Sequence, residues 1–254
     1  MMQQAQDLLD EGKELKALLE TLSDEDWQTP TPFKNWTVND VMQHLHSGDQ
    51  MAVLSLTDPE RFEAVKRDRS LLPEAMKQQK EGQALFTAWW DYLVEMSQLL
   101  GESDPKRRVP WFGPDMGVKM FTTARQMETW AHAHDIYDLK RQTRQYSDRI
   151  RNIAEIGVRT YGWTFVNRKL EPPGPMPYVK LTAPSGAIWE WGEPSQTEYI
   201  SGSAVEFCHV VTQGRNIQDV SLEVHGEVAT QWMAIAQCFA GPPEQPPAPG
   251  SREA

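Results

Sequence analysis

The sequence is poor in cysteine, in long apolar runs and in excess positive charge. Only two cysteines, Cys208 and Cys238, occur among 254 residues, and two cannot staple a chain of this size with disulfides. We therefore expect a reduced, cytoplasmic protein in which both cysteines are buried small hydrophobic side chains. The segment from Met1 to Gln4 has neither the basic nor the apolar region of a signal peptide, which agrees with that location.

The charge balance and the hydropathy disfavour two classes of partner. Lys and Arg number 25 against 36 Asp and Glu, so the net charge is −11, and a chain this acidic repels nucleic acid. No stretch approaches the roughly 20 apolar residues that a membrane span needs. Hydrophobic residues still make up 39% of the chain, which is enough for a packed core. We expect a globular monomer or homodimer with no nucleic-acid or membrane partner.

Residues 1–146 show the apolar spacing of amphipathic helices. The expected helices cover about 3–22, a segment from Thr37 onward, 73–100 and 118–139, with a surface connection at 58–69 and a loop at 101–117. The second helix has a sharp start, because Thr37 can cap it and Asp40 stands in the capping-box position. Four helices with one longer connection predict a four-helix bundle, a fold in which facing helices build metal sites.

The pattern changes after residue 147, where strand signals alternate with helical ones. We expect a helix at 148–158, a hairpin of 179–181 with 187–191, a strand at 198–202, a helix at 203–211, a strand at 221–226 and a helix at 227–239. These elements predict a separate α+β domain over residues 147–240. Residues 241–254 are rich in proline and are expected to be a disordered tail. The predicted fold class is mainly α followed by α+β.

One helical turn carries the most informative chemistry of the chain, Glu128-x-x-x-His132-x-x-Asp135. Residues four and seven apart return to the same face of a helix. The turn therefore presents a carboxylate and an imidazole that converge on one point, with a second carboxylate one turn further on. This is half of a divalent metal site, which needs another donor from elsewhere in the fold.

Several histidines compete for the remaining role. His44 lies about two turns into the capped helix, on the margin of the face that must meet the fourth helix, and the bundle also contains His46 and His134. A single helical histidine is more often a core or surface residue than a ligand. A Glu–His pair four residues apart also occurs as a plain surface contact. Periodicity leaves both the metal site and these plainer alternatives open.

Two segments resemble the metal-ligand motifs of the DinB-like superfamily, which includes the mycothiol-dependent maleylpyruvate isomerases. Residues 35–45, NWTVNDVMQHL, resemble the first motif, and residues 125–135, RQMETWAHAHD, resemble the second. Residues 181–186 and 202–213 are similar to a subgroup described only as metal-binding proteins. The resemblance extends over about residues 5–243, with several motifs in order.

The resemblance implies that His44, Glu128 and His132 are the three metal ligands and that the metal is usually zinc. The fold it implies is a DinB-like four-helix bundle followed by a small α/β domain related to sterol carrier proteins. Three protein ligands leave one coordination position open, which is typical of a catalytic zinc rather than a structural one. Asp135 would then orient His132 from outside the ligand set.

The chemistry that the resemblance implies is action on a small-molecule substrate with a low-molecular-weight thiol, in particular mycothiol, as cofactor or cosubstrate. The metal would hold the thiolate as a nucleophile. In the isomerases the thiolate adds to a conjugated double bond, permits rotation and leaves, and in other relatives it displaces a leaving group. Arg215 stands where relatives often carry arginine and would pair with an acid group of the thiol or the substrate. Asp49 and His134 are candidate proton carriers, with a surface position as the alternative for both.

Three functions are therefore compatible with the residues. The first is a thiol-dependent metalloenzyme, either an isomerase or a transferase. The second is a non-catalytic, metal-stabilised protein that binds an apolar ligand, favoured by the tryptophans of the second half: Trp163, Trp189, Trp191 and Trp232. The third is metal-dependent hydrolysis by bound water without any thiol. The three share their metal ligands and differ in whether a thiol is required.

Overall fold

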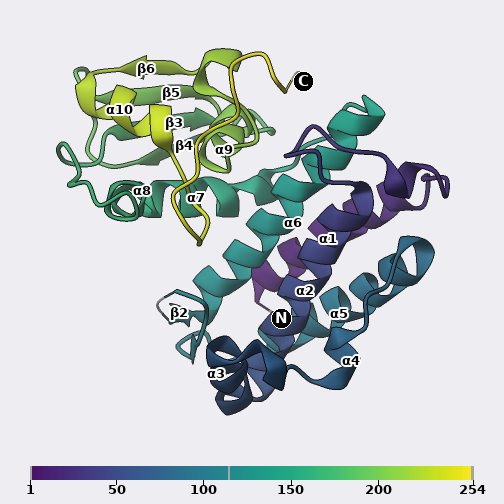
Figure 1. Ribbon diagram of the computed structural model, residues 1–254. Coiled ribbons are helices and arrows are strands. Elements are labelled where there is room, and N and C mark those ends of the chain that lie inside the picture. Colours follow the sequence, from purple (N-terminus) through teal and green to yellow (C-terminus); the bar gives the residue numbers. More distant parts are fainter. Residues whose placement is uncertain (1, 114, 253–254) are drawn as a thin grey trace. The chain divides into compact units, whose positions relative to one another are not determined.

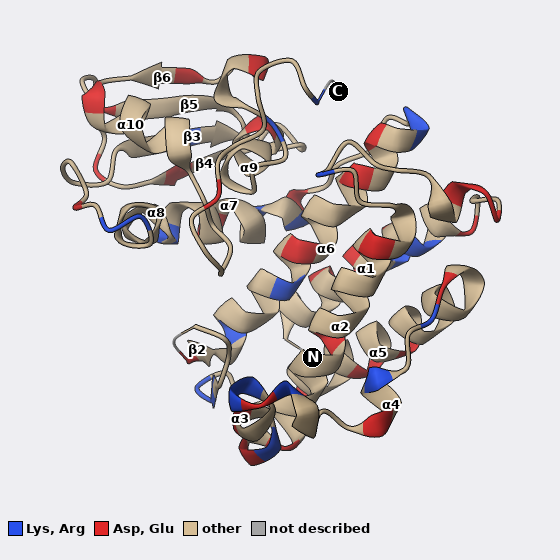
Figure 2. Cartoon of the chain, in the orientation of Figure 1, with Lys and Arg blue, Asp and Glu red and all other residues tan. Residues whose placement is uncertain are grey.

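The computed structural model describes residues 2–113 and 115–252, and the chain divides into two compact units, Met1–Lys140 and Arg141–Ala254 (Figure 1). The division falls a few residues before the expected domain boundary at 146/147. Among the residues that the structure describes, no helix combines the length and the apolar character that a membrane crossing needs. Acidic and basic residues are interspersed along both units (Figure 2).

The first unit is built from four long helices. These are α1 (Gln3–Leu19), α2 (Val38–Thr57), α5 (Gly82–Glu102) and α6 (Val118–Lys140). Helices α1 and α2 each pack against both α5 and α6, which confirms the predicted bundle. The apolar stripes of the helices face inward, and the largest fully buried aliphatic and aromatic side chains there include Leu8, Leu15, Met42, Leu45, Leu85 and Trp89.

The start of α2 follows the sequence prediction closely. The amide of Asp40 donates to the Thr37 hydroxyl over 3.1 Å, and the amide of Thr37 donates to the Asp40 carboxylate over 2.9 Å. This capping box satisfies two amides that have no partner within the helix. It fixes the residue at which the helix begins and therefore the angular position of every side chain along it.

Two segments of the first unit differ from the prediction. The expected surface connection at 58–69 contains a helix, α3 (Pro59–Arg67), followed by the short η2 (Arg69–Leu71). The Asp58 carboxylate accepts from the Arg61 amide over 3.0 Å, and Pro59 suits the first helical position. The expected helix 73–100 is interrupted: α4 (Glu74–Lys77) ends before α5 begins at Gly82, whose φ of 54° is left-handed.

Short irregular segments complete the first unit. The loop between α1 and α2 contains η1 (Asp26–Gln28), and the predicted loop at 101–117 contains a two-stranded pair of β1 (Arg108–Val109) with β2 (Met116–Gly117). The chain passes directly from β2 into α6. The segment therefore delivers the chain to the start of the helix that carries Glu128 and His132.

The second unit is a four-stranded mixed sheet with surrounding helices. The strands are β3 (Tyr178–Thr182), β4 (Ile188–Trp191), β5 (Tyr199–Ser203) and β6 (Glu223–His225), in the order β4-β3-β5-β6. Strands β3 and β5 are parallel and the other pairs are antiparallel. The helical elements are η3 (Asp148–Ile150), α7 (Arg151–Arg159), α8 (Tyr161–Val166), α9 (Ala204–Val211), η4 (Ile217–Asp219) and α10 (Glu227–Ile235).

The predicted fold class, mainly α followed by α+β, is therefore confirmed. Helix α8 was not predicted, and α10 ends at Ile235, before the expected residue 239. The proline-rich segment after residue 240 forms no helix or strand in its described part. It nevertheless makes specific contacts, which differs from the predicted disorder. Asn216 donates to the carbonyl of Pro247 over 2.8 Å, the amide of Gly250 donates to Asp219 over 2.9 Å, and Arg252 is buried.

Candidate metal centre

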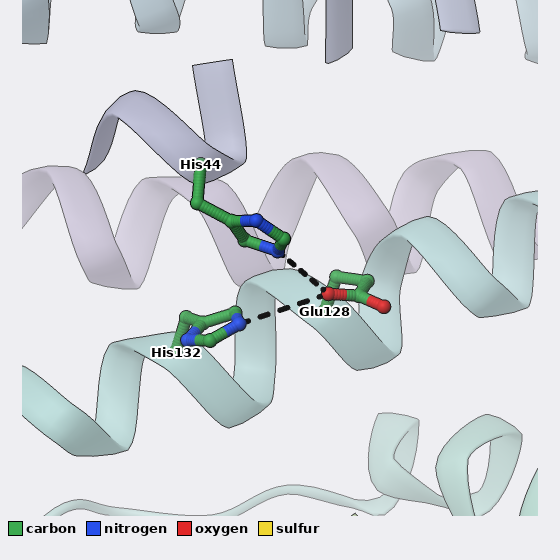
Figure 3. Close-up of side chains that lie close together, drawn as sticks. All are labelled: His44, Glu128 and His132. Carbon is green, nitrogen blue, oxygen red and sulfur yellow. Dashed lines mark hydrogen bonds and ion pairs between the residues drawn. The ribbon is translucent and has the colours of Figure 1, made fainter. Parts of the chain in front are cut away.

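His44 on α2 meets Glu128 and His132 on α6, and the three side chains point toward one another (Figure 3). One donor atom from each residue lies within 4.8 Å of the other two. The Nε2 atom of His44 is 3.2 Å from Oε2 of Glu128, and Nε2 of His132 is 3.8 Å from the same oxygen. The helical spacing of four stacks Glu128 and His132 on one face of α6, and the packing of α2 against α6 supplies His44.

The spacing of these donors suits a small divalent cation. Zinc binds imidazole nitrogen and carboxylate oxygen at about 2.0–2.2 Å, so donors of a tetrahedral site stand roughly 3.3–3.5 Å apart. The separations of 3.2 Å and 3.8 Å lie close to that value. Two imidazoles and one carboxylate are also the donor types that zinc accepts. The residues present therefore fit a metal with three protein ligands.

The three side chains differ in their access to solvent. The His44 side chain is 43% exposed, whereas Glu128 is 21% exposed and His132 is 11% exposed. The cluster is therefore supported from the side of α6 and accessible at His44.

Glu128 is held in its charged form. Burial alone would raise the pKa of this carboxyl, but the hydrogen bond with His44 and the charges of His132 and Arg125 outweigh burial and lower the pKa to about 2. At neutral pH the group is a carboxylate. It offers a cation a negative donor without first having to lose a proton.

Asp135 makes the contact that its expected orienting role requires. Its Oδ2 atom lies 2.8 Å from Nδ1 of His132, and its side chain is buried. With Nδ1 of His132 donating to this carboxylate, the Nε2 atom of the ring is the one that faces Glu128. A buried carboxylate behind a histidine fixes the tautomer and the ring orientation, as it does in many metal sites.

Two aromatic side chains support the histidines, and the sequence analysis missed them as site residues. The ring of Trp36 lies nearly parallel to His132, with centroids 6.1 Å apart, and 5.5 Å from the ring of His44. Phe33 meets His132 edge-on at 5.1 Å. The loop is closed by the Thr31 amide, which donates to the carbonyl of Trp36 over 2.7 Å. The only sequence signal was the place of Trp36, immediately before the helix cap.

Asp49 is fully buried, so the surface position considered for it is wrong. Its Oδ1 atom accepts from Nη2 of Arg125 over 2.8 Å and from Nε over 3.2 Å. Burial raises the pKa of Asp49, and Arg125 opposes that shift by stabilising the charge. The carboxylate is thus the partner of a buried arginine and not one of the three clustered donors.

The other two candidate histidines of the bundle also lie outside the cluster. His134 is buried, which excludes the surface position, and its Nδ1 donates to the carbonyl of Trp130 over 2.8 Å. His46 is buried beside Tyr92, with ring centroids 5.4 Å apart. Burial and then the charge of Lys80 lower the pKa of His46 to about 4. Both residues are explained by packing within the bundle.

The remaining candidates belong to the second unit. Arg215 is buried there and donates from Nη1 to the carbonyl of Gly214 over 2.8 Å, and its pairing with an acid group stays a prediction. Cys208 and Cys238 are both buried, as expected. Burial, together with the neighbouring Cys238, raises the pKa of the Cys208 thiol well above its ordinary value, so that thiol is unreactive.

Comparisons with known proteins match both the sequence and the fold. The family model described as the mycothiol maleylpyruvate isomerase N-terminal domain matches residues 8–137. Uncharacterized proteins from two strains of Mycobacterium tuberculosis are each 34% identical over 244 residues, covering 93% of this chain and 95% of their own.

Two solved structures share the fold. The crystal structure of the mycothiol-dependent maleylpyruvate isomerase matches with a TM-score of 0.53 and 11% identity, over 82% of this chain and 87% of that one. A histidine-to-alanine mutant of the isomerase matches with the same TM-score and coverage at 12% identity. Identities this low establish the common fold alone.

Proposed function

Because the chain belongs to the mycothiol maleylpyruvate isomerase N-terminal domain family, we propose that it is a metal-dependent enzyme that uses a low-molecular-weight thiol. The reaction class is isomerisation or group transfer, with mycothiol or a similar thiol as cofactor or cosubstrate. The observation that carries the proposal is the convergence of His44, Glu128 and His132 from two helices, with donor atoms within 4.8 Å of one another.

The metal would be held by Nε2 of His44, the carboxylate of Glu128 and Nε2 of His132. Zinc is the first candidate, because two imidazoles and one carboxylate are a common set of protein ligands in catalytic zinc sites. When bound, the ion would supply a Lewis acid that lowers the pKa of a thiol and stabilises the thiolate.

The protein's own residues prepare the site for an anion. One ionised carboxylate beside a divalent cation gives a net charge of about +1, which favours a thiolate over a neutral ligand. By accepting from Nδ1, Asp135 orients the ring of His132 so that Nε2 is the atom turned toward the cation. The chain's own thiols are buried, so the reactive thiol must come from a separate molecule.

An isomerase of this kind needs no oxidant or reductant. The thiolate forms a carbon–sulfur bond to a conjugated double bond, the former double bond rotates, and the carbon–sulfur bond breaks to regenerate both the alkene and the thiolate. In a transferase the same thiolate displaces a leaving group. Arg215 would pair with a carboxylate of the thiol or of the substrate, because its guanidinium binds carboxylates in a bidentate manner.

A turnover assay tests the proposal against its alternatives. Zinc-loaded protein is incubated with maleylpyruvate and with a panel of electrophiles, in the presence of mycothiol, glutathione, bacillithiol or no thiol. We expect turnover only in a thiol-containing arm, and loss of turnover in His44→Ala. Turnover of esters or amides without any thiol would instead identify a hydrolase. No turnover in any arm at full metal occupancy would favour a non-catalytic binding protein.

A further inference from the structure

A buried ion pair joins the two helices that carry the metal-site residues. Arg125 lies on α6, one turn before Glu128, and Asp49 lies on α2, just over one turn after His44. The Nη2 and Nε atoms of Arg125 are 2.8 Å and 3.2 Å from Oδ1 of Asp49, and the two side chains are only 6% and 0% exposed. The pair thus bridges α2 and α6 beside the cluster.

The guanidinium group also lies directly against the backbone of α2. A Cβ atom built on Gly48 would be 2.7 Å from Nη2 and 3.0 Å from Nη1 of Arg125, closer than a methyl group can approach. Gly48 stands in the interior of α2, where glycine costs about 0.5–1 kcal/mol relative to alanine. Gly48 therefore lowers the stability of the helix but leaves the space that the guanidinium of Arg125 occupies.

Stability alone gives a poor account of this arrangement. A buried ion pair is often no more stabilising than apolar side chains of similar size, because both charges must lose their water. The metal-site residues, however, come from two different helices. Their spacing depends on how far apart α2 and α6 stand and on how each helix is rotated, which a directional contact near the site controls.

We propose that Arg125 and Asp49 are a positioning pair that fixes α2 against α6 and so holds His44 at metal-binding distance from Glu128 and His132. This inference rests on the proposed metal site. The pair is also neutral as a whole, since Asp49 cancels the charge that Arg125 would otherwise place near the cation. Removal of Asp49 alone would leave a buried positive charge beside the metal.

Three variants separate positioning from stability. Arg125→Met combined with Asp49→Leu removes the contact but leaves a neutral, apolar pair of similar size. Gly48→Ala removes no charge and raises helix propensity, but its methyl group displaces the guanidinium. Asp49→Asn leaves Arg125 without its counter-charge. The matched control is Gly162→Ala in α8, where an added Cβ meets nothing within 4 Å.

The readouts are the Kd for Co²⁺, measured by competition with a coloured chelator, and the visible spectrum of the cobalt-saturated protein, with circular dichroism to verify folding. We expect a Kd about 10–100-fold weaker in the double variant and in Asp49→Asn, the range typical of residues that support metal ligands. Gly48→Ala should also weaken the Kd and change the spectrum. Gly162→Ala should do neither.

Wild-type Kd and spectrum in both the double variant and Gly48→Ala would overturn the inference, because the pair would then serve only the stability of the bundle. If the double variant does not fold, Gly48→Ala decides the question. Absence of cobalt binding by the wild-type protein would overturn the proposed metal site itself, together with this inference. The two failures are therefore distinguishable.

Discussion

The two units of the chain differ in whether their metal-donor and thiol side chains are clustered and accessible to solvent. The bundle brings His44, Glu128 and His132 together and leaves His44 accessible to solvent. In the described part of the second unit no comparable group of metal donors occurs, and both thiols there are buried. The comparison teaches that the clustered metal-donor side chains come from facing helices of the bundle, while the sheet unit keeps its two thiols away from solvent.

The difference follows from how each unit builds its core. In the bundle, a polar face of α6 meets α2, and buried charges such as Asp49 and Arg125 are paired across that contact. In the second unit, Phe207 and Trp232 are completely buried and pack with ring centroids 6.0 Å apart. Aromatic packing explains Trp232 without requiring an apolar ligand.

The largest expected effect is the loss of metal when a donor in the bundle is removed. His44→Ala and Glu128→Ala should each weaken zinc affinity by more than about 100-fold, because two remaining donors cannot hold the ion. The measurement is elemental analysis after equilibration in buffer of fixed free zinc. The control is His225→Ala in the second unit, an exposed histidine stacked on Tyr199. Undiminished metal in both bundle variants would remove the site.

The second-largest expected effect is the slow chemical labelling of the two thiols in the second unit. Burial keeps the Cys208 thiol protonated and out of reach, so a thiol reagent must wait for the unit to open. We expect native protein to be labelled at least about 100-fold more slowly than unfolded protein. The labelling rate is followed by absorbance, with Cys208→Ala and Cys238→Ala assigning the sites. Rapid labelling of Cys208 in native protein would end the contrast between the two units.

The third effect is on stability against pH in metal-free protein. The pKa of Glu128 falls from 4.5 to about 2 on folding, so the ionised carboxylate stabilises the fold above pH 4.5. That contribution, about 3 kcal/mol, is lost as the pH falls from 4.5 toward 2. The free energy of unfolding of the wild-type protein, measured in urea, should therefore exceed that of Glu128→Gln above pH 4.5, and this difference should disappear as the pH falls toward 2. The matched control is Glu74→Gln, which makes the same change at an exposed carboxylate. A difference in unfolding free energy between wild type and Glu128→Gln that does not change with pH would contradict the prediction.

The smallest expected effect is the loss of zinc affinity when Asp135, which contacts the ligand His132, is changed. Asp135→Asn keeps the size of the side chain but weakens its hold on Nδ1 of His132, and zinc affinity should fall about 10–100-fold. The affinity is measured by chelator competition, with Asp91→Asn on the exposed surface of α5 as the matched control. Equal affinities in the two variants would show that Asp135 does not orient the histidine.

Local signals in the sequence were sufficient for much of the fold and for half of the site. The capping box of Thr37 and Asp40 lies within one turn, and the spacing of Glu128 and His132 is fixed by helical geometry. Helix α3 was missed although Asp58 and Pro59 are a strong start signal, because the charged residues that follow suggested a surface turn.

Other parts depend on packing that no local pattern encodes. Periodicity could not choose among His44, His46 and His134, because the choice depends on the rotation of α2 against α6. The contact between Arg125 and Asp49 joins residues 76 positions apart in the sequence. Such a pair becomes visible only when the two helices are placed side by side.

The most direct test of the proposed thiol-dependent site is the visible spectrum of the cobalt-substituted protein during titration with a thiol. With mycothiol, glutathione or bacillithiol, we predict a sulfur-to-cobalt charge-transfer band and a shift of the cobalt bands that saturate together and are absent in His44→Ala. An unchanged spectrum with all three thiols, at full cobalt occupancy, would contradict the proposal that an open metal position in the bundle binds a thiolate.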